Sequence, residues 1–199
     1  MDDRPTRDIL DATYLALCEH GFADLTVQDI AAHTETSKAT IHYHYDSKRD
    51  LFVAFLADLY EGYTDHMDGV TRESPREELF ALVEASLEEG DDVPGVDFRT
   101  AMLEIKAQSP YDDAFRERLR EFDDYLFERI RSVVAAGIEA GEFDDDVDPD
   151  RVAEFLTTTI SGAHTRRVAV DHSLDRLRET LIEYVERNLV ADETAEVSA

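Results

Sequence analysis

Residues 26–51 read TVQDIAAHTETSKATIHYHYDSKRDL, and this stretch decides the fold. Three short helices are expected to begin in it, because Thr26, Ser37 and Ser47 can each cap the N-terminus of a helix. Thr26 and Ser47 are also followed by an aspartate three residues later, which is the spacing of a capping box. Helices of about eight residues are not stable alone. We therefore expect these helices to pack on neighbouring ones.

The apolar positions of this stretch separate a buried side from an exposed side. The buried side is expected to combine its apolar residues with those of the preceding helix: Val27, Ile30, Ala31, Ile41, Ile9, Leu10, Ala16 and Leu17. The exposed side then carries Lys38, Thr40, His42, Tyr43 and His44, and no carboxylate occurs from Ser37 to Tyr45. Hydroxyl, imidazole and ammonium groups suit contacts with phosphates and base edges. This side predicts a DNA-binding surface, and a polar surface helix with two incidental histidines is the alternative.

The same stretch resembles the N-terminal domain of the TetR family of transcription regulators. The matching elements are Gly21-Phe22, Thr26–Ala31, Ser37–Tyr45 and Ser47–Leu51, and their spacing matches without gaps. The resemblance implies a helix-turn-helix over about residues 27–46. In it, residues 27–34 form the supporting helix and residues 38–45 the recognition helix, which lies in the major groove.

The resemblance also implies roles for single residues. Thr26, Tyr43 and Lys48 match positions that usually contact the phosphate backbone. Base reading is expected from Gln28, Thr36, Lys38, Ala39, Thr40 and His44, and Ser37 and His42 complete the expected DNA-binding set. Two residues depart from the family pattern, since Glu35 stands where a turn glycine is common and His42 where tyrosine is more common. A residue other than glycine at position 35 is strained if its backbone is left-handed.

The rest of the chain is also expected to be helical. A capping residue followed by proline occurs at Ser74-Pro75, Ser109-Pro110 and Asp148-Pro149, which is a signature of helix N-termini. Strand-like alternation and hairpin turn signals are missing. The predicted fold class is all-α, with about nine helices. They are expected at residues 5–20, 27–34, 38–45, 48–70, 75–89, 97–107, 110–140, 149–170 and 174–190.

These elements predict two domains and a tail. We expect a DNA-binding domain over residues 4–64 and a larger ligand-binding and dimerisation domain over residues 65–190. Residues 191–199 lack an apolar stripe and are expected to be flexible.

Two apolar stripes near the C-terminus predict a homodimer interface, and a two-fold dimer also suits double-stranded DNA with a palindromic operator. By the resemblance, the last two helices form a four-helix interface with those of a second copy. The alternative is that both stripes pack on the chain's own helices. The expected interface residues are Val152, Phe155, Leu156, Ile160, Leu174, Leu177, Leu181 and Val185.

A pocket for a small-molecule effector of unknown identity is expected between the central helices. The residues proposed to line it are Phe98, Met102, Ile105, Phe115, Phe122, Tyr125 and Phe127. Ordinary core packing is the alternative for each of them.

The charge of the chain is unusual for a protein expected to bind DNA. The chain has 47 acidic and 20 basic residues, which give a formal net charge of -27, and only three of its residues are lysines. Residues 1–50 hold ten acidic and five basic residues, so most of the excess lies beyond the DNA-binding segment. This composition is typical of halophilic proteins, whose acidic surfaces stay hydrated in molar salt. An ordinary acidic protein is the alternative.

Several other classes of protein are excluded by missing motifs. The chain has no Glu-x-x-His, Gly-x-Ser-x-Gly or Cys-x-x-Cys sequence and no glycine-rich phosphate loop, so we expect no enzyme. The histidines are scattered and Cys18 is the single cysteine, expected to be an inert thiol, so we expect neither a metal site nor a cofactor. No membrane span or signal peptide is recognisable, which predicts a cytoplasmic protein.

Together these features predict a repressor that leaves its operator when a small molecule binds. The alternative is an acidic helical adaptor that binds protein partners and no DNA.

Overall fold

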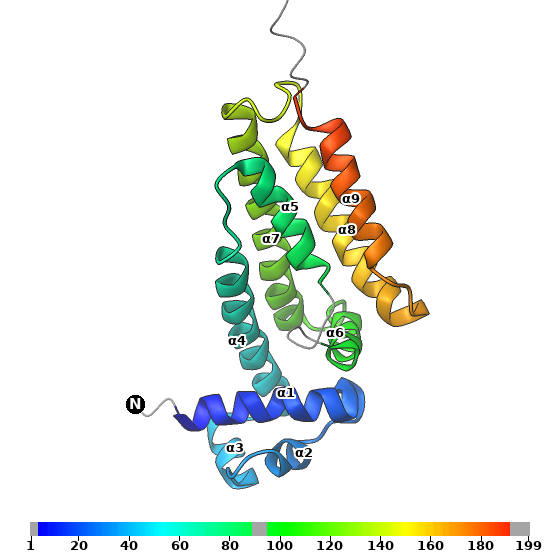
Figure 1. Cartoon of the computed structure of the whole chain (residues 1–199). Helices are drawn as coiled ribbons and strands as arrows, with labels where there is room; N and C mark the ends of the chain where they lie inside the picture. The colour runs from blue at the N-terminus through cyan, green and yellow to red at the C-terminus, as the bar shows by residue number, and fades with distance from the viewer. Residues whose placement is uncertain (1–3, 89–94, 192–199) are drawn as a thin grey trace, which may run out of the picture. The chain divides into compact units, whose positions relative to one another are not determined.

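The computed structural model describes residues 4–88 and 95–191, and every regular element of this part is an α-helix (Figure 1). The prediction of an all-α fold is therefore confirmed. The helices are α1 (Arg4–Asp24), α2 (Val27–Ala32), α3 (Lys38–His44), α4 (Lys48–Asp68), α5 (Pro75–Ser86), α6 (Val96–Gln108), α7 (Asp113–Glu139), α8 (Pro149–Val170) and α9 (Asp175–Asn188).

The chain forms two compact units, and α4 and α7 each contribute to both. The first unit consists of residues 4–63 and 95–122, and it contains α1, α2, α3 and α6. The second consists of residues 64–88 and 123–191, and it contains α5, α8 and α9. Along α4, the change of unit falls between residues 63 and 64. Residues 95–122 were expected in the second domain, yet they join the first unit because α6 packs along α1.

Two predicted helix limits illustrate how the ends are set. The regular part of α1 ends where predicted, because Gly21 has the non-helical angles φ 70° and ψ 169°. The predicted start of α7 at residue 110 is wrong. The Ser109 hydroxyl does not cap this helix but donates to the carbonyl oxygen of Lys106 (2.8 Å). Asp112 caps it instead, since its Oδ1 accepts from the N–H groups of Ala114 (2.9 Å) and Phe115 (3.3 Å).

The core of the first unit is the apolar layer that the sequence predicted beneath the helices expected to bind DNA. Ile30 of α2 and Ile41 of α3 are buried, while Val27 and Ala31 are partly buried against the same cluster. Helix α6 adds further buried residues from the other side of α1. The buried members of this cluster include Ile9, Leu10, Ala16, Leu17, Phe98, Ala101 and Ile105. Burial of this layer holds α2 and α3, which have six and seven residues and are too short to be stable alone.

The second unit is held by close packing between its helices. The rings of Phe155 on α8 and Tyr184 on α9 are 4.7 Å apart. Arg129 of α7 pairs with Glu78 of α5 at 2.8 Å, and both side chains are largely buried. The antiparallel bridge between Phe143 and Val190 ties the α7–α8 connection to the end of α9.

The two apolar stripes of α8 and α9 pack mainly within this unit. Six of the eight residues that we expected at a dimer interface are buried in the single chain, each no more than 7% exposed. They are Val152, Leu156, Ile160, Leu174, Leu181 and Val185. A side chain that the chain's own core covers cannot also cover a second copy, so the choice of these six residues is corrected. Phe155 is 41% exposed and Leu177 is partly exposed.

Candidate DNA-binding site

The first helix of the motif begins with a complete capping box. The Asp29 N–H donates to Thr26 Oγ1 (3.3 Å), and the Thr26 N–H donates in return to Asp29 Oδ2 (2.8 Å). The Thr26 hydroxyl also donates to Asp29 Oδ2 (2.7 Å). These hydrogen bonds lower the pKa of the Asp29 carboxyl, because they stabilise its charged form. The start of α2 is thereby fixed by two residues that were identified from sequence.

The second helix is capped by the Ser37 side chain alone. Its Oγ accepts from the Thr40 N–H (3.2 Å), and its hydroxyl is 2.9 Å from Thr40 Oγ1. The turn before it is unstrained at Glu35, because Asp171 is the one non-glycine residue with positive φ in the described ranges. The cost that we considered for a non-glycine residue at position 35 therefore does not arise.

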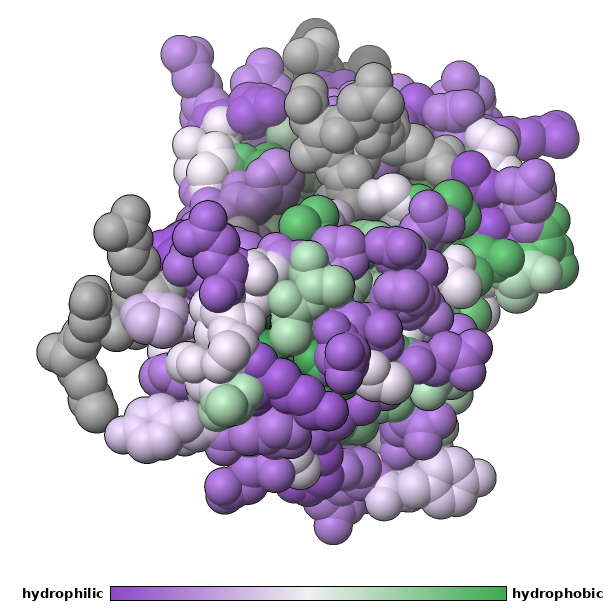
Figure 2. All heavy atoms as spheres, turned by 90° about the horizontal axis from the view of Figure 1, so that it is seen from below, coloured by the Kyte–Doolittle hydropathy of each residue, from purple (hydrophilic) through white to green (hydrophobic). Residues whose placement is uncertain are grey.

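Helix α3 presents its polar side chains to solvent. Ile41 is 1% exposed and anchors the helix, whereas Tyr43 is 85% exposed. Lys38, His42 and His44 are also exposed. Of the remaining expected DNA-binding residues, those with exposed side chains are Thr26, Gln28, Ser37 and Ala39, and those partly exposed are Thr36 and Thr40. Figure 2, which views the molecule from the side of α2 and α3, shows a mainly hydrophilic surface.

Lys48 is placed differently from the expectation. Its Nζ donates to the carbonyl oxygen of Phe22 (2.5 Å) and lies 4.6 Å from the centroid of the Phe22 ring. Partial burial lowers the pKa of its ammonium group. The side chain therefore joins the N-terminus of α4 to the end of α1.

Helix α6 supports the same end of α1. Glu104 Oε2 accepts hydrogen bonds from the N–H groups of Phe22 (2.6 Å) and Ala23 (3.1 Å). Both donors follow Gly21, whose non-helical angles interrupt α1, so they begin a new helical turn in which the first N–H groups have no helical acceptor. One carboxylate of α6 therefore fixes the chain where it turns from α1 toward the helix-turn-helix.

Comparisons with known proteins agree with this geometry. Residues 9–55 match the family described as bacterial regulatory proteins, tetR family, and residues 75–190 match the C-terminal family described as BetI-type transcriptional repressor. The chain belongs to the TetR family of transcriptional repressors. It is no enzyme, and its nine described helices follow the architecture of that family.

Individual relatives of this TetR-family repressor cover almost the whole chain. A crystal structure of a TetR transcription regulator from Haloarcula marismortui is 39% identical with a TM-score of 0.87, and the match covers 94% of this chain and 99% of that one. A regulator from Saccharomonospora viridis, crystallised in complex with choline, is 27% identical with a TM-score of 0.84, covering 96% and 100%. The repressor AcnR of Corynebacterium glutamicum is 27% identical, covering 90% and 91%.

None of the described helices combines the length and apolar content needed to cross a membrane.

The residues proposed for an effector pocket are divided between the two units of this repressor. Phe98, Ile105 and Phe115 are buried in the core of the first unit, and Met102 packs against it. The Phe122 ring lies 5.3 Å from that of Tyr60 in the same unit. In the second unit, the Tyr125 hydroxyl donates to Asp68 Oδ1 (2.6 Å), and Phe127 is partly buried. For Phe98 and Ile105 the structure supports the alternative of ordinary core packing.

A surface hollow of about 320 Å³ lies in the first unit and includes one of these residues, Phe115. An ion pair between Arg49 and Asp112 (2.5 Å) forms part of its wall. The Arg49 guanidinium lowers the pKa of the Asp112 carboxyl. The remaining lining residues are Phe22, Lys48, Gln108 and Tyr111.

Sequence reasoning missed one group of side chains. His20 and His33 were taken as scattered histidines, yet both approach the carboxylate of Glu19. They are thirteen positions apart in the sequence, and the packing of α2 on α1 brings them together. The spacing alone does not resemble a metal-binding motif, so no sequence signal identifies this group.

Proposed function

We propose that this repressor binds a palindromic double-stranded operator as a homodimer and is released by a small-molecule effector. The observation that carries DNA binding is the exposed side of α3. It combines an ammonium group, two imidazoles and a phenol without any carboxylate from Ser37 to Tyr45, in a chain of net charge -27. Such a gap in an acidic surface suits the approach of a polyanion.

Within this side, the exposed residues have distinct roles. Tyr43 and Lys38 are proposed to contact phosphates, since each exposes a hydrogen-bond donor beyond the helix. His42 and His44, together with Gln28 of the neighbouring α2, are proposed to reach base edges in the major groove. Thr26 and Lys48 are left out of this set, because the Thr26 hydroxyl already donates to Asp29 and one donor of the Lys48 ammonium group is already used by Phe22.

The test of DNA binding compares two exposed tyrosines. Tyr43 is 85% and Tyr111 is 89% exposed, so replacing either by alanine should leave the fold intact. Fluorescence anisotropy with DNA from upstream of the protein's own gene should show that Tyr43→Ala weakens specific binding about tenfold or more. Tyr111→Ala should bind as the wild type does. Equal binding by wild type and both variants would refute the role of α3. A folded wild-type dimer that binds no DNA specifically would favour an adaptor.

The dimer is proposed to use the exposed, uncharged side of α8. This side consists of Phe155, Thr158, Gly162, Thr165 and Ala169, which recur at intervals of three and four residues. Two copies of so acidic a chain repel each other unless the surfaces that meet are low in charge. The palindromic operator supports the same symmetry, because two reading helices need two half-sites.

Gly162 offers a selective test of this interface. A Cβ at Gly162 meets no atom within 4 Å in the single chain, and the same holds for Gly62 on α4. Gly162→Leu therefore fits the monomer but should obstruct a second copy, whereas Gly62→Leu is a matched control. Analytical ultracentrifugation should show a dimer for the wild type and Gly62→Leu, and a monomer for Gly162→Leu. A dimer in all three would place the interface elsewhere.

The effector is proposed to be a small organic cation that enters the second unit. The regulator from Saccharomonospora viridis has choline bound, and the C-terminal part of this chain matches the BetI-type family. In the described part of the second unit, the hydroxyl oxygens of Ser86 and Thr157 are buried without a hydrogen-bond partner. Buried hydroxyl groups without partners are costly, and a bound ligand can satisfy them.

Choline itself is the first probe for this effector. Isothermal titration should show choline binding to the wild type and weaker binding to Thr157→Val, which keeps the shape of the side chain but removes its hydroxyl. Choline should also lower the affinity of the wild type for its operator DNA. Absence of any heat with choline, in protein that still binds DNA, would exclude choline as the effector and leave DNA binding standing.

A further inference from the structure

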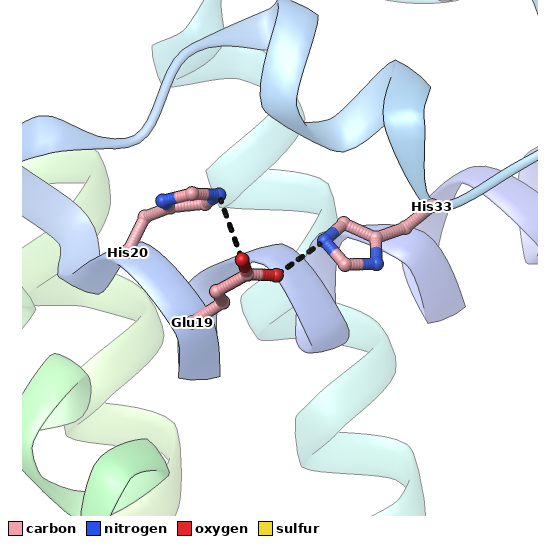
Figure 3. Close-up of side chains that lie close together, drawn as sticks. All are labelled: Glu19, His20 and His33. Atoms are coloured by element: carbon pink, nitrogen blue, oxygen red, sulfur yellow. Dashed lines mark ion pairs between the residues drawn. The ribbon is translucent and has the colours of Figure 1, made fainter.

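The end of α1 and the end of α2 hold three metal-ligating side chains close together (Figure 3). Glu19 Oε2 is 3.1 Å from Nε2 of His33, and Glu19 Oε1 is 4.0 Å from Nε2 of His20. One ligand atom from each residue lies within 4.8 Å of the others. Glu19 and His20 belong to α1, and His33 is the C-cap of α2.

We propose that Glu19, His20 and His33 bind a divalent transition metal ion, with Zn²⁺ as the best fit. Two imidazoles and one carboxylate are the protein ligands of many zinc sites that keep a fourth position for water. Zinc ligands lie about 2.0–2.2 Å from the ion, so tetrahedral ligand atoms are roughly 3.3 Å apart. The pair Glu19–His33 already has this spacing, and His20 needs a small side-chain rotation.

The surroundings favour a cation at this position. The His20 side chain is 35% exposed and stands immediately before Gly21, where the regular helix ends, so its ring is not confined by a packed neighbour on every side. The two imidazole ligands distinguish this group from the many exposed carboxylates of the chain. Carboxylates alone favour Mg²⁺ and Ca²⁺, whereas imidazoles favour Zn²⁺ and other transition metal ions.

An ion at this site connects two helices of the DNA-binding domain. The ion would bind Glu19, His20 and His33 directly, in place of the contacts that Glu19 now makes with the two imidazoles. It would thereby join α1 to the end of α2, the supporting helix. Metal binding to the folded state alone stabilises that state by mass action. This inference is independent of the operator, the dimer and the effector.

Zinc binding by the full chain tests the proposal directly. Competition with a chromogenic chelator should show a Zn²⁺ dissociation constant at least about tenfold higher for His20→Ala/His33→Ala than for the wild type. The matched control is His66→Ala/His172→Ala, which removes two histidines outside the group and should bind Zn²⁺ as the wild type does. Co²⁺ in place of Zn²⁺ should give the intense visible absorption of a tetrahedral site in the wild type and the control only.

Thermal unfolding gives a second, independent measurement. Zn²⁺ should raise the midpoint of the wild type and of the control, but not that of His20→Ala/His33→Ala. If the double alanine variant does not fold, Glu19→Gln takes its place, because it keeps the shape of the side chain. Equal Zn²⁺ affinity in all folded variants, or Co²⁺ absorption that does not depend on these residues, would overturn the proposal and leave only ion pairs between Glu19 and the two histidines.

Discussion

At the scale of single residues, Gly21 shows how backbone freedom positions the helix-turn-helix. Its angles, φ 70° and ψ 169°, fall in a region that is open essentially to glycine alone. A Cβ there would also lie 3.2 Å from Glu104 Oε2, the oxygen that accepts from Phe22. Gly21→Ala should therefore lower the free energy of unfolding by about 1–3 kcal/mol.

Urea unfolding measures this effect, and Gly62→Ala is a control of opposite sign. Gly62 lies within α4, away from the helix ends, and an added Cβ there meets no atom within 4 Å. At such a position alanine is the better helix former by about 1 kcal/mol. An unchanged or higher stability of Gly21→Ala would show that the chain can turn here without glycine.

A pH effect is expected from the capping box of α2. Hydrogen bonds from Thr26 lower the pKa of Asp29 in the folded state. A carboxyl with a lowered folded pKa contributes stability above its unfolded pKa, and this contribution is lost as the pH falls through the folded pKa. The melting temperature should therefore fall as the pH drops below about 4, and it should fall less for Asp29→Asn. Equal decreases in both proteins would assign the acid sensitivity to other carboxyls.

Capping residues show what could be predicted at this scale and what could not. Thr26 and Ser37 cap as expected, because the oxygen that caps and the N–H groups it serves lie within three residues. Ser109 has the same local signal, but its hydroxyl donates to the Lys106 carbonyl oxygen at the end of α6. The position of the Lys48 ammonium depends on Phe22, which is 26 residues away, so no local pattern could reveal it.

At the scale of whole elements, the end of α7 depends on one close approach. A Cβ on Gly137 would lie 2.2 Å from Cδ2 of Phe143, whose ring is 1% exposed. Gly137→Ala therefore forces the ring and its connection to move, and overpacking of this kind costs about 1–3 kcal/mol. Differential scanning calorimetry should show a lower midpoint for Gly137→Ala. In the double variant Gly137→Ala/Phe143→Leu, the smaller side chain should restore part of the lost midpoint. If the decrease in the double variant equals the sum of the two single decreases, this contact is not the cause.

The apolar stripes of α8 and α9 mark the limit of prediction for elements. Helical periodicity identifies the apolar side of each helix, and the buried Leu156, Ile160 and Leu181 lie on it as expected. Periodicity does not say whether that side meets the same chain or another copy. Here the chain's own helices cover it. Of the exposed side of α8, Phe155 alone was expected at the interface, because the other residues, such as Gly162, are small and weakly apolar. In contrast, the inward side of α3 was identified correctly, because Ile41 has a core to enter within the same unit.

At the scale of the whole molecule, charge opposes the function that the fold performs. Acidic residues outnumber basic ones by 27, and Glu35 and Asp46 flank the carboxylate-free side of α3. Binding of a basic protein releases cations from DNA, so its affinity falls steeply with rising salt. An acidic protein must instead bring cations between its carboxylates and the phosphates. Uptake of these cations offsets the release from DNA, and high salt also screens the repulsion between the two surfaces.

Operator binding should therefore tolerate salt. Between about 0.1 and 3 M KCl, the affinity for operator DNA should stay level or rise, against the steep fall that counterion release gives basic proteins. Glu35→Gln/Asp46→Asn should bind more tightly at low salt and lose more affinity as the salt rises, because fewer cations are then taken up on binding. A matched pair of exposed acidic residues in the second unit, Glu179→Gln/Glu183→Gln, should change neither quantity to a comparable degree. A steep loss of wild-type affinity toward molar salt would mean that the basic and polar groups of α3 dominate the interface, and the halophilic interpretation of the composition would then fail.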